Sequence, residues 1–279
     1  MDTSKIKNYM IILLAIVNIF LLSIVLKNVS DDRAAKEYAT AALERVLAEN
    51  NIVMSENVAL PEKMPTEVTL SRSLLKERRK LSSLIGSCSA QDLGGNIIYY
   101  RGNEGQASFR GTGEFEIALE KAIIPRTDDL LSGCYTVTKK LGIDLADIEP
   151  DLKTDGSSQI VSLTCAWNGT PVYNASVEFS FTPDRLYLIT GMRPLDTEVS
   201  IRALEDYPDS ATILMSFLAY ARQTGDAFSK ITNVELGYFI SSSASGSCVL
   251  RPVWCILTDS GKYYINGQTG KPESLEYAS

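Results

Sequence analysis

The sequence contains no histidine among its 279 residues. A Ser-His-Asp triad or a Cys-His pair is therefore excluded, because no imidazole is present to act as the base. Zinc sites that depend on histidine, including the H-E-x-x-H motif, are excluded for the same reason. Basic residues are outnumbered, with 27 Lys and Arg against 34 Asp and Glu, a formal net charge of -7. We therefore expect no nucleic-acid partner, since phosphate binding needs a concentrated positive face.

Cysteine is present but in an uninformative pattern. The five residues form no C-x-x-C pair, and their odd number requires that at least one thiol stays unpaired or pairs between chains: Cys88, Cys134, Cys165, Cys248 and Cys255. This pattern indicates neither a disulfide framework nor a metal site.

Catalytic and cofactor motifs are also lacking. Gly111-Thr112-Gly113 has no third glycine and precedes a strand pattern, so it predicts a turn and not a dinucleotide site. Ser73 and Lys76 match the S-x-x-K motif of penicillin-binding enzymes, but the companion S-D-N and K-T-G triplets are missing, which favours a chance match. We expect no catalytic residue, no cofactor, no metal and no small-molecule substrate, and the sequence does not predict an enzyme.

One long apolar run stands near the start. Residues 9–26 are free of charge and, as a helix, would extend about 27 Å, close to the roughly 30 Å hydrocarbon core of a bilayer. A signal peptide is the competing interpretation, but the run is long for one and no cleavage site follows it directly. We predict a single transmembrane anchor helix over 9–26, preceded by a short terminus, 1–8. Basic residues flank the run on both sides, so charge does not decide its orientation.

The remaining pattern predicts helices followed by groups of strands. Helices are expected at 31–50, 71–86, 128–142 and 209–221, with Gly142 ending the third and Asp209 opening the fourth. Strands are expected at 67–70, 96–101, 106–110, 114–119, 158–168, 172–181, 185–192, 231–241, 248–258 and 262–265. The predicted fold class is α+β: the anchor helix, then two lobes of antiparallel sheets with helices packed on one side. We place a membrane-proximal helix or stalk at 27–60, the first lobe at 61–145 and the second at 146–279. The helix at 31–50 either continues out of the membrane as a stalk or packs on the base of the domain.

The predicted helix at 71–86 carries a basic face. Its members are Arg72, Lys76, Arg78, Arg79 and Lys80. A solvated helix face explains this run, and so does a contact for anionic lipid or an acidic partner. Both interpretations remain open at this point.

Two stretches of the chain resemble a known family. The start, MDTSKIK leading into NIFLL at 18–22, resembles the amino terminus of the YycI regulators. The segments NGTPVY at 168–173 and VEFSF at 177–181, together with LRPVW at 250–254 and DSGKYYIN at 259–266, are similar to the YycI/YycH extracytoplasmic domain. The last hairpin is also similar to PepSY-type modules.

The resemblance implies a function without catalysis. YycI and YycH proteins are regulators of an essential two-component sensor kinase, of the WalK (YycG) type, that controls cell-wall metabolism in Gram-positive bacteria. It implies an N-terminus inside the cell, an extracytoplasmic domain, and partners that are the sensor histidine kinase, a second YycH-like regulator and the membrane. Asn18, Phe20 and Ser23 are then candidate contacts within the anchor, and Arg78, Arg79 and Trp254 are candidate contacts outside. The alternative is a PepSY-like module, similar to YpeB, that restrains or stabilises an extracytoplasmic peptidase or cell-wall hydrolase.

Overall fold

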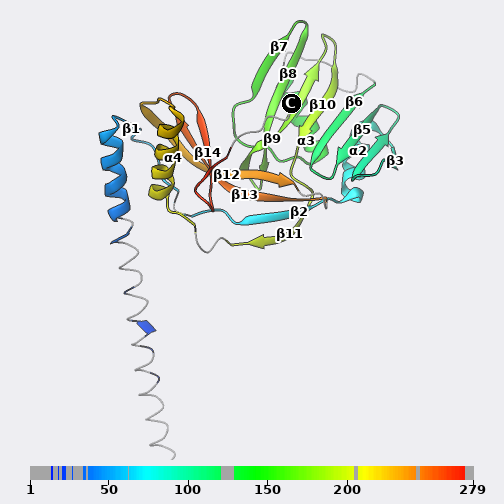
Figure 1. The fold of residues 1–279 in the computed structure, drawn as a ribbon. Coiled ribbons are helices and arrows are strands. Elements are labelled where there is room, and N and C mark those ends of the chain that lie inside the picture. Colours follow the sequence, from blue (N-terminus) through cyan, green and yellow to red (C-terminus); the bar gives the residue numbers. More distant parts are fainter. Residues whose placement is uncertain are drawn as a thin grey trace, which may run out of the picture.

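The computed structural model describes residues 14, 18, 21, 22, 27, 34, 35, 37–61, 63–120, 129–203, 207–242 and 246–273. Figure 1 shows strands along most of the molecule, with helices at both ends. The described strands join into a single 15-stranded sheet. That sheet has two parts, which we call the first array and the second array.

The first array is antiparallel throughout and runs in the order β7-β8-β9-β10-β6-β5-β4-β3. Its strands are β3 (Ser89–Asp92), β4 (Ile97–Arg101), β5 (Gly105–Arg110), β6 (Glu114–Leu119), β7 (Asp151–Asp155), β8 (Ser158–Trp167), β9 (Thr170–Phe181) and β10 (Leu186–Met192).

The second array has the order β11-β2-β13-β12, with β14 beside β13, β15 beside β14 and β1 beside β12. Its strands are β1 (Val53–Met54), β2 (Glu67–Ser71), β11 (Thr197–Arg202), β12 (Lys230–Ser242), β13 (Ser247–Thr258), β14 (Lys262–Asn266) and β15 (Pro272–Glu273). The pairing of β1 with β12 is parallel, so the sheet is mixed.

The two arrays meet where β12 crosses β9. A single parallel residue pair, Tyr238 with Val172, joins the strands. The Asn174 side chain extends this junction: its Oδ1 accepts from the Ile240 N–H at 2.7 Å and its Nδ2 donates to the Ile240 carbonyl at 2.9 Å. One amide side chain thus supplies the two hydrogen bonds that a neighbouring strand would otherwise make.

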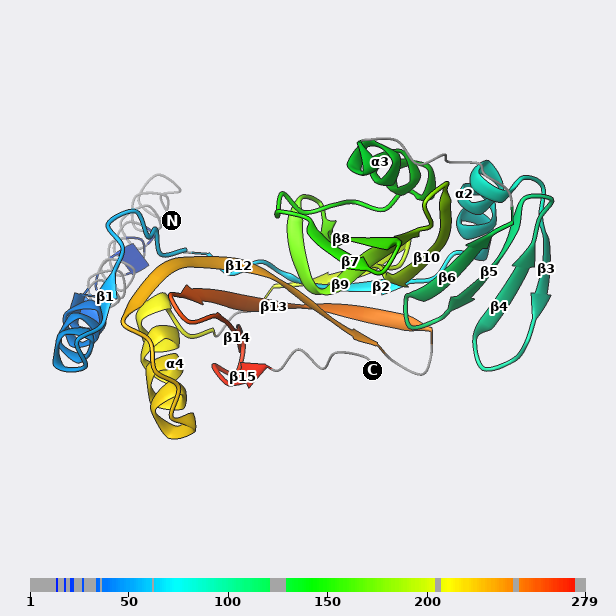
Figure 2. The same ribbon diagram turned by 90° about the horizontal axis from the view of Figure 1, so that it is seen from above.

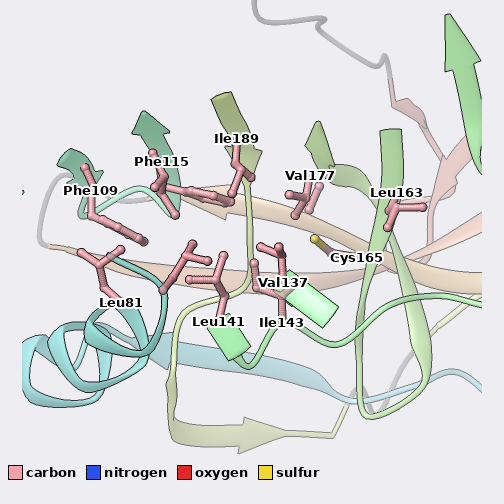
Figure 3. Close-up of a cluster of buried hydrophobic side chains, with 14 of the residues drawn as sticks. Leu81, Phe109, Phe115, Val137, Leu141, Ile143, Leu163, Cys165, Val177 and Ile189 are labelled. Atoms are coloured by element: carbon pink, nitrogen blue, oxygen red, sulfur yellow. The ribbon is translucent and has the colours of Figure 1, made fainter. Parts of the chain in front are cut away.

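A first core lies between the first array and two helices, α2 (Leu74–Ile85) and α3 (Leu130–Leu141). Figure 3 shows apolar side chains from the strands pointing at side chains of these helices, with Leu81, Val137 and Leu141 facing Phe109, Phe115 and Ile189. The α3 boundaries follow from local chemistry. Asp129 accepts from the Ser132 N–H at its start, and Gly142 ends it at a left-handed φ of 60°. The predicted end of this helix is confirmed.

A second core lies at the other end of the molecule. In this core Leu43 and Leu47 of the helix at 37–49 pack together with Phe217 of α4 (Ser210–Thr224) and Trp254 of β13. Residues 37–49 therefore pack on the domain and do not stand apart as a stalk. Asp209 caps α4 by accepting from the Thr212 N–H at 2.7 Å, which confirms the predicted start of that helix.

The predicted fold class was wrong. The hairpin of β12 and β13, 13 and 12 residues long, runs in Figure 2 from beside α4 toward β6 and lines both cores. On β12, Val234 belongs to the second core while Tyr238 and Ile240, on the same face, belong to the first. At about 3.3 Å per residue, such a strand reaches both helix groups, so the two arrays form one mixed sheet. The predicted lobe boundary at 145/146 falls between α3 and β7, and β6 pairs with β10 across it.

The structure describes only four residues of the predicted transmembrane helix: 14, 18, 21 and 22. Among the described residues, none of the helices combines the length and the apolar character needed to cross a bilayer. Most of the predicted span, 9–26, lies outside the described residues.

Candidate functional site

The most distinctive polar feature is a buried chain of charges between α2 and the segment that follows β10. Glu77 is placed inward because it shares the buried stripe of α2 with Leu81 and Leu84. Arg193 and Asp196 lie in the connection between β10 and β11. These two segments are more than a hundred residues apart in sequence, and the fold brings them together beneath the first array.

The charges alternate in sign along this chain, which we call the charge network. Arg72 forms a two-point contact with Glu77, from Nη2 to Oε1 at 2.6 Å and from Nε to Oε2 at 2.9 Å. Glu77 Oε2 also lies 3.5 Å from Arg193 Nη2. Arg193 in turn holds Asp196 at 3.1 and 3.3 Å, and Lys80 Nζ closes the chain 2.6 Å from Asp196 Oδ1.

Neutral groups complete the hydrogen bonding around these charges. The Tyr100 hydroxyl donates to Glu77 Oε1 at 2.7 Å, and Arg72 donates to the Asn96 and Phe109 carbonyls at 2.7 and 3.1 Å. The Arg193 guanidinium lies 5.4 Å from the centre of the Phe109 ring, a cation–π contact. Such contacts are required here, because Glu77 is only 2% exposed and a buried charge is costly without them.

The charge network holds α2 and the segment after β10 against the first array, and we call this role the clamp. Burial by itself raises the pKa of Asp196, but Arg193 and Lys80 outweigh burial and hold that pKa below its usual value. Both carboxylates are engaged by cationic donors, Glu77 by Arg72 and Arg193, and Asp196 by Arg193 and Lys80. The network fixes α2 and the start of β11 to the first array.

A cavity of about 100 Å³ opens beside the clamp. Lys80, Asp144, Trp167 and Asp196 are among its lining residues. This volume holds about three water molecules, far less than the several hundred Å³ of a typical ligand pocket. The cavity therefore adds no substrate site to the network.

The basic face of α2 divides into two groups. Arg72 and Lys80 belong to the charge network, so a solvated helix face is the wrong interpretation for them. Arg78 and Arg79 are exposed, with Arg78 Nε donating to the Cys88 carbonyl at 3.1 Å. Leu75, one helical turn before Arg79 and on the same face, is 71% exposed.

The S-x-x-K match has a structural role. The Ser73 hydroxyl caps α2 by accepting from the Lys76 N–H at 3.4 Å. The Lys76 ammonium donates to the Asp196 carbonyl at 3.2 Å and to the Thr197 hydroxyl at 3.4 Å. Ser73 therefore opens α2, and Lys76 ties the helix to the start of β11.

The other predicted contact residues are placed differently. Trp254 is buried in the second core, 2% exposed, and its Nε1 has no hydrogen-bond partner, so it is not an outer contact. Its neighbours on the opposite face of β13, Val253 and Cys255, are buried as well, so this part of the strand is covered on both faces. Asn18 is helical and exposed, whereas Phe20 and Ser23 lie outside the described residues.

The cysteines carry no reactive site. All five are free and buried. Burial raises the pKa of Cys134, Cys165 and Cys255 to about 12, which keeps these thiols protonated at neutral pH. Within the described ranges no three His, Cys, Asp or Glu side chains are grouped to hold a metal ion.

Comparison with known proteins does not identify the function of this site. No protein-family profile matches the sequence, and no curated protein matches it. A solved structure of an uncharacterized protein from Eubacterium rectale ATCC 33656 is similar with a TM-score of 0.49 and 12% identity, over 77% of this chain and 86% of that chain. That similarity carries no functional information.

Proposed function

We propose that this protein is a non-enzymatic regulator that binds a two-component sensor histidine kinase of cell-wall metabolism at the outer side of the cell membrane. The YycI/YycH-like segments supply the identity of the partner. The exposed face of α2 supplies a surface for it, and this face is the structural observation that carries the proposal.

The face of α2 combines an apolar and a basic group on a rigid support. Leu75 and Arg79 lie one turn apart, and arginine is enriched at contact surfaces between proteins. The charge network fixes the inner side of the same helix through Glu77 and Lys80. A partner therefore meets a preorganised surface and loses little conformational entropy in ordering it.

The charge of this face indicates what kind of partner surface it binds. The protein is acidic as a whole, with a net charge of -7, so a basic, partly apolar helix face selects an acidic surface on the partner. Binding regulates the kinase only if the contact is stronger with one of its conformations than with the other. We expect the contact to involve the extracytoplasmic part of the kinase.

Co-isolation tests the proposal. The full chain, tagged and expressed in a Gram-positive host, is purified from detergent-solubilised membranes, and the bound proteins are identified by mass spectrometry. The test variant is Leu75→Glu with Arg79→Glu. The matched control is Tyr135→Glu with Lys139→Glu, an exposed apolar and basic pair with the same spacing on α3.

The proposal predicts that the parent chain and the control variant retain a histidine kinase and a second YycH-like regulator. The test variant should retain the kinase about tenfold less, the loss expected when a central contact costs roughly 1.4 kcal/mol. Recovery of a peptidase or cell-wall hydrolase without the kinase would favour the PepSY-like role and contradict the kinase proposal. Equal recovery of the kinase by both variants would remove α2 as the contact.

A further inference from the structure

The hairpin of β8 and β9 turns on an asparagine–glycine pair. Asn168 and Gly169 follow the last residue pair of the ladder between these strands. Both have a left-handed backbone, with φ of 50° and 77°, and such a pair is the preferred sequence for a two-residue hairpin turn. The pair also has a chemical property of its own. Because glycine adds no side chain to the approach, its backbone nitrogen comes close to the side-chain amide of the preceding asparagine.

The Gly169 amide points at a carboxylate. Its N–H donates to Asp144 Oδ2 at 3.0 Å, a distance within the reach of a general base. Asp144 is exposed and lies in the connection between α3 and β7. Gly169 stands between the two strands, so its N–H takes no part in their pairing. Asp144 is therefore placed to take this proton without the loss of a hydrogen bond between strands.

The side chain of Asn168 is unrestrained. It is exposed, and among the described residues none holds its amide by a hydrogen bond. The space around the turn is open as well, since a Cβ atom built on Gly169 would meet no other atom within 4 Å. Water and the reacting groups therefore have room at this peptide bond.

The second asparagine–glycine pair of the sequence, Asn266 and Gly267, provides the contrast. Asn266 Oδ1 accepts from two backbone N–H groups at 2.8 and 2.9 Å, and its Nδ2 donates to Glu273 Oε1 at 2.7 Å. The Gly267 N–H donates to the Pro252 carbonyl at 2.9 Å. A Cβ atom on Gly267 would lie 2.7 Å from Met64 Cε. The same dipeptide is open to reaction in one turn and held fast in the other.

We propose that Asn168 is a site of spontaneous covalent modification, deamidation through a cyclic imide, with Asp144 as the base. The Gly169 nitrogen gives its proton to Asp144 and forms a bond to the side-chain carbonyl carbon of Asn168. The carbon–nitrogen bond of the side-chain amide then breaks, and ammonia leaves with that proton. Water opens the ring at either carbonyl and gives aspartate or isoaspartate. One water is consumed and one ammonia released, with no oxidant or reductant.

The modification changes a turn beside the junction of the two arrays. Either product places a second carboxylate next to Asp144, and like charges repel. Isoaspartate also lengthens the turn by one backbone atom, shortly before Val172, which pairs with Tyr238 of β12. Both changes oppose the native hairpin, and because the ammonia is lost, the modified form accumulates with the age of the protein.

Peptide mass spectrometry tests the proposal on the full chain, kept in a mild detergent because of its apolar residues 9–26. The folded protein is incubated at neutral pH, samples are digested over time, and fragment spectra assign the change from amide to acid to Asn168 or Asn266. Asp144→Asn removes the base and keeps a hydrogen-bond acceptor for Gly169. Asp147→Asn removes an exposed acid of the same connection and is the matched control. A urea-unfolded sample gives the rates without the fold.

The proposal predicts that Asn168 in the folded parent converts at least about tenfold faster than Asn266, whose hydrogen bonds must break first. Asp144→Asn should slow the conversion of Asn168 by about tenfold, and Asp147→Asn should leave it unchanged. In urea both asparagines should convert at similar rates, with no effect of either substitution. Equal rates in the folded parent, equal effects of the two substitutions, or an effect of Asp144→Asn that persists in urea would overturn the proposal.

Discussion

Glu77 offers the sharpest test of the clamp, through the substitution Glu77→Gln. The change keeps the size of the side chain and removes its charge. In the folded protein it leaves Arg72 without a carboxylate partner, while Arg193 and Lys80 share the one remaining carboxylate, that of Asp196. The amide nitrogen of glutamine also places N–H donors against the N–H groups of Arg72, where Glu77 now accepts at 2.6 and 2.9 Å.

Breaking a buried ion pair from one side costs about 3–5 kcal/mol. For a chain of this size each kcal/mol lowers the midpoint of thermal unfolding by roughly 2–4 °C, so we expect a fall of roughly 10 °C. The assay is thermal unfolding followed by far-ultraviolet circular dichroism. Glu116→Gln, an exposed acid on β6, is the matched control and should stay within about 0.5 kcal/mol of the parent.

A double variant checks the cause. Once Glu77 has lost its charge, Arg72→Met removes one of the unpaired buried cations, so the double variant should be less destabilised than the sum of the two single variants. A coupling of about 1–3 kcal/mol is expected for residues in one network. A midpoint for Glu77→Gln equal to that of Glu116→Gln would refute the clamp as described.

Three further outcomes follow from buried polar groups. Asn174→Ala should destabilise the protein by about 1–3 kcal/mol in urea unfolding, because the Ile240 N–H loses its acceptor at the junction of the arrays; a loss within that of an exposed Asn→Ala change would contradict this role. The pKa of Asp196 is lower in the folded than in the unfolded chain, so its contribution is present above the unfolded value, near 4, and is lost as the pH falls through the folded value. Asp196→Asn should therefore show a weaker dependence of the urea midpoint on pH below about 4 than the parent, and an identical dependence would count against it. The native protein should leave all five cysteines unreacted with a thiol reagent at neutral pH while urea exposes them, and rapid reaction of the native protein would contradict their burial.

Local elements were predictable because their signals are local. Gly142 ends α3 and Asp209 opens α4, as capping chemistry indicates. Most of the predicted strands are present, since alternating apolar residues reflect burial on one face. Strand β11 had no such signal, because its exposed residues are not organised by a core.

The arrangement of these elements was not predictable in the same way. The two-lobe prediction failed because no local pattern tells how far a strand extends past one core into another. Lys80 read as part of a surface because its partner, Asp196, is more than a hundred residues away in the sequence. Arg72 pairs with Glu77, which is only five residues away. One signal was available: Glu77 occupies the same helical stripe as Leu81 and Leu84, which marks it as a buried carboxylate that needs cationic partners.

Contact between α2 and the kinase is the central claim, and site-specific photo-crosslinking tests it most directly. A photoreactive phenylalanine analogue replaces Leu75 in the full chain in living cells, and in a separate strain it replaces Tyr135 on α3, which is 47% exposed. Crosslinked products are purified and identified by mass spectrometry. The account predicts a histidine kinase joined to position 75 and absent from position 135. A position 75 that captures no histidine kinase, or captures it no more than position 135 does, would contradict it.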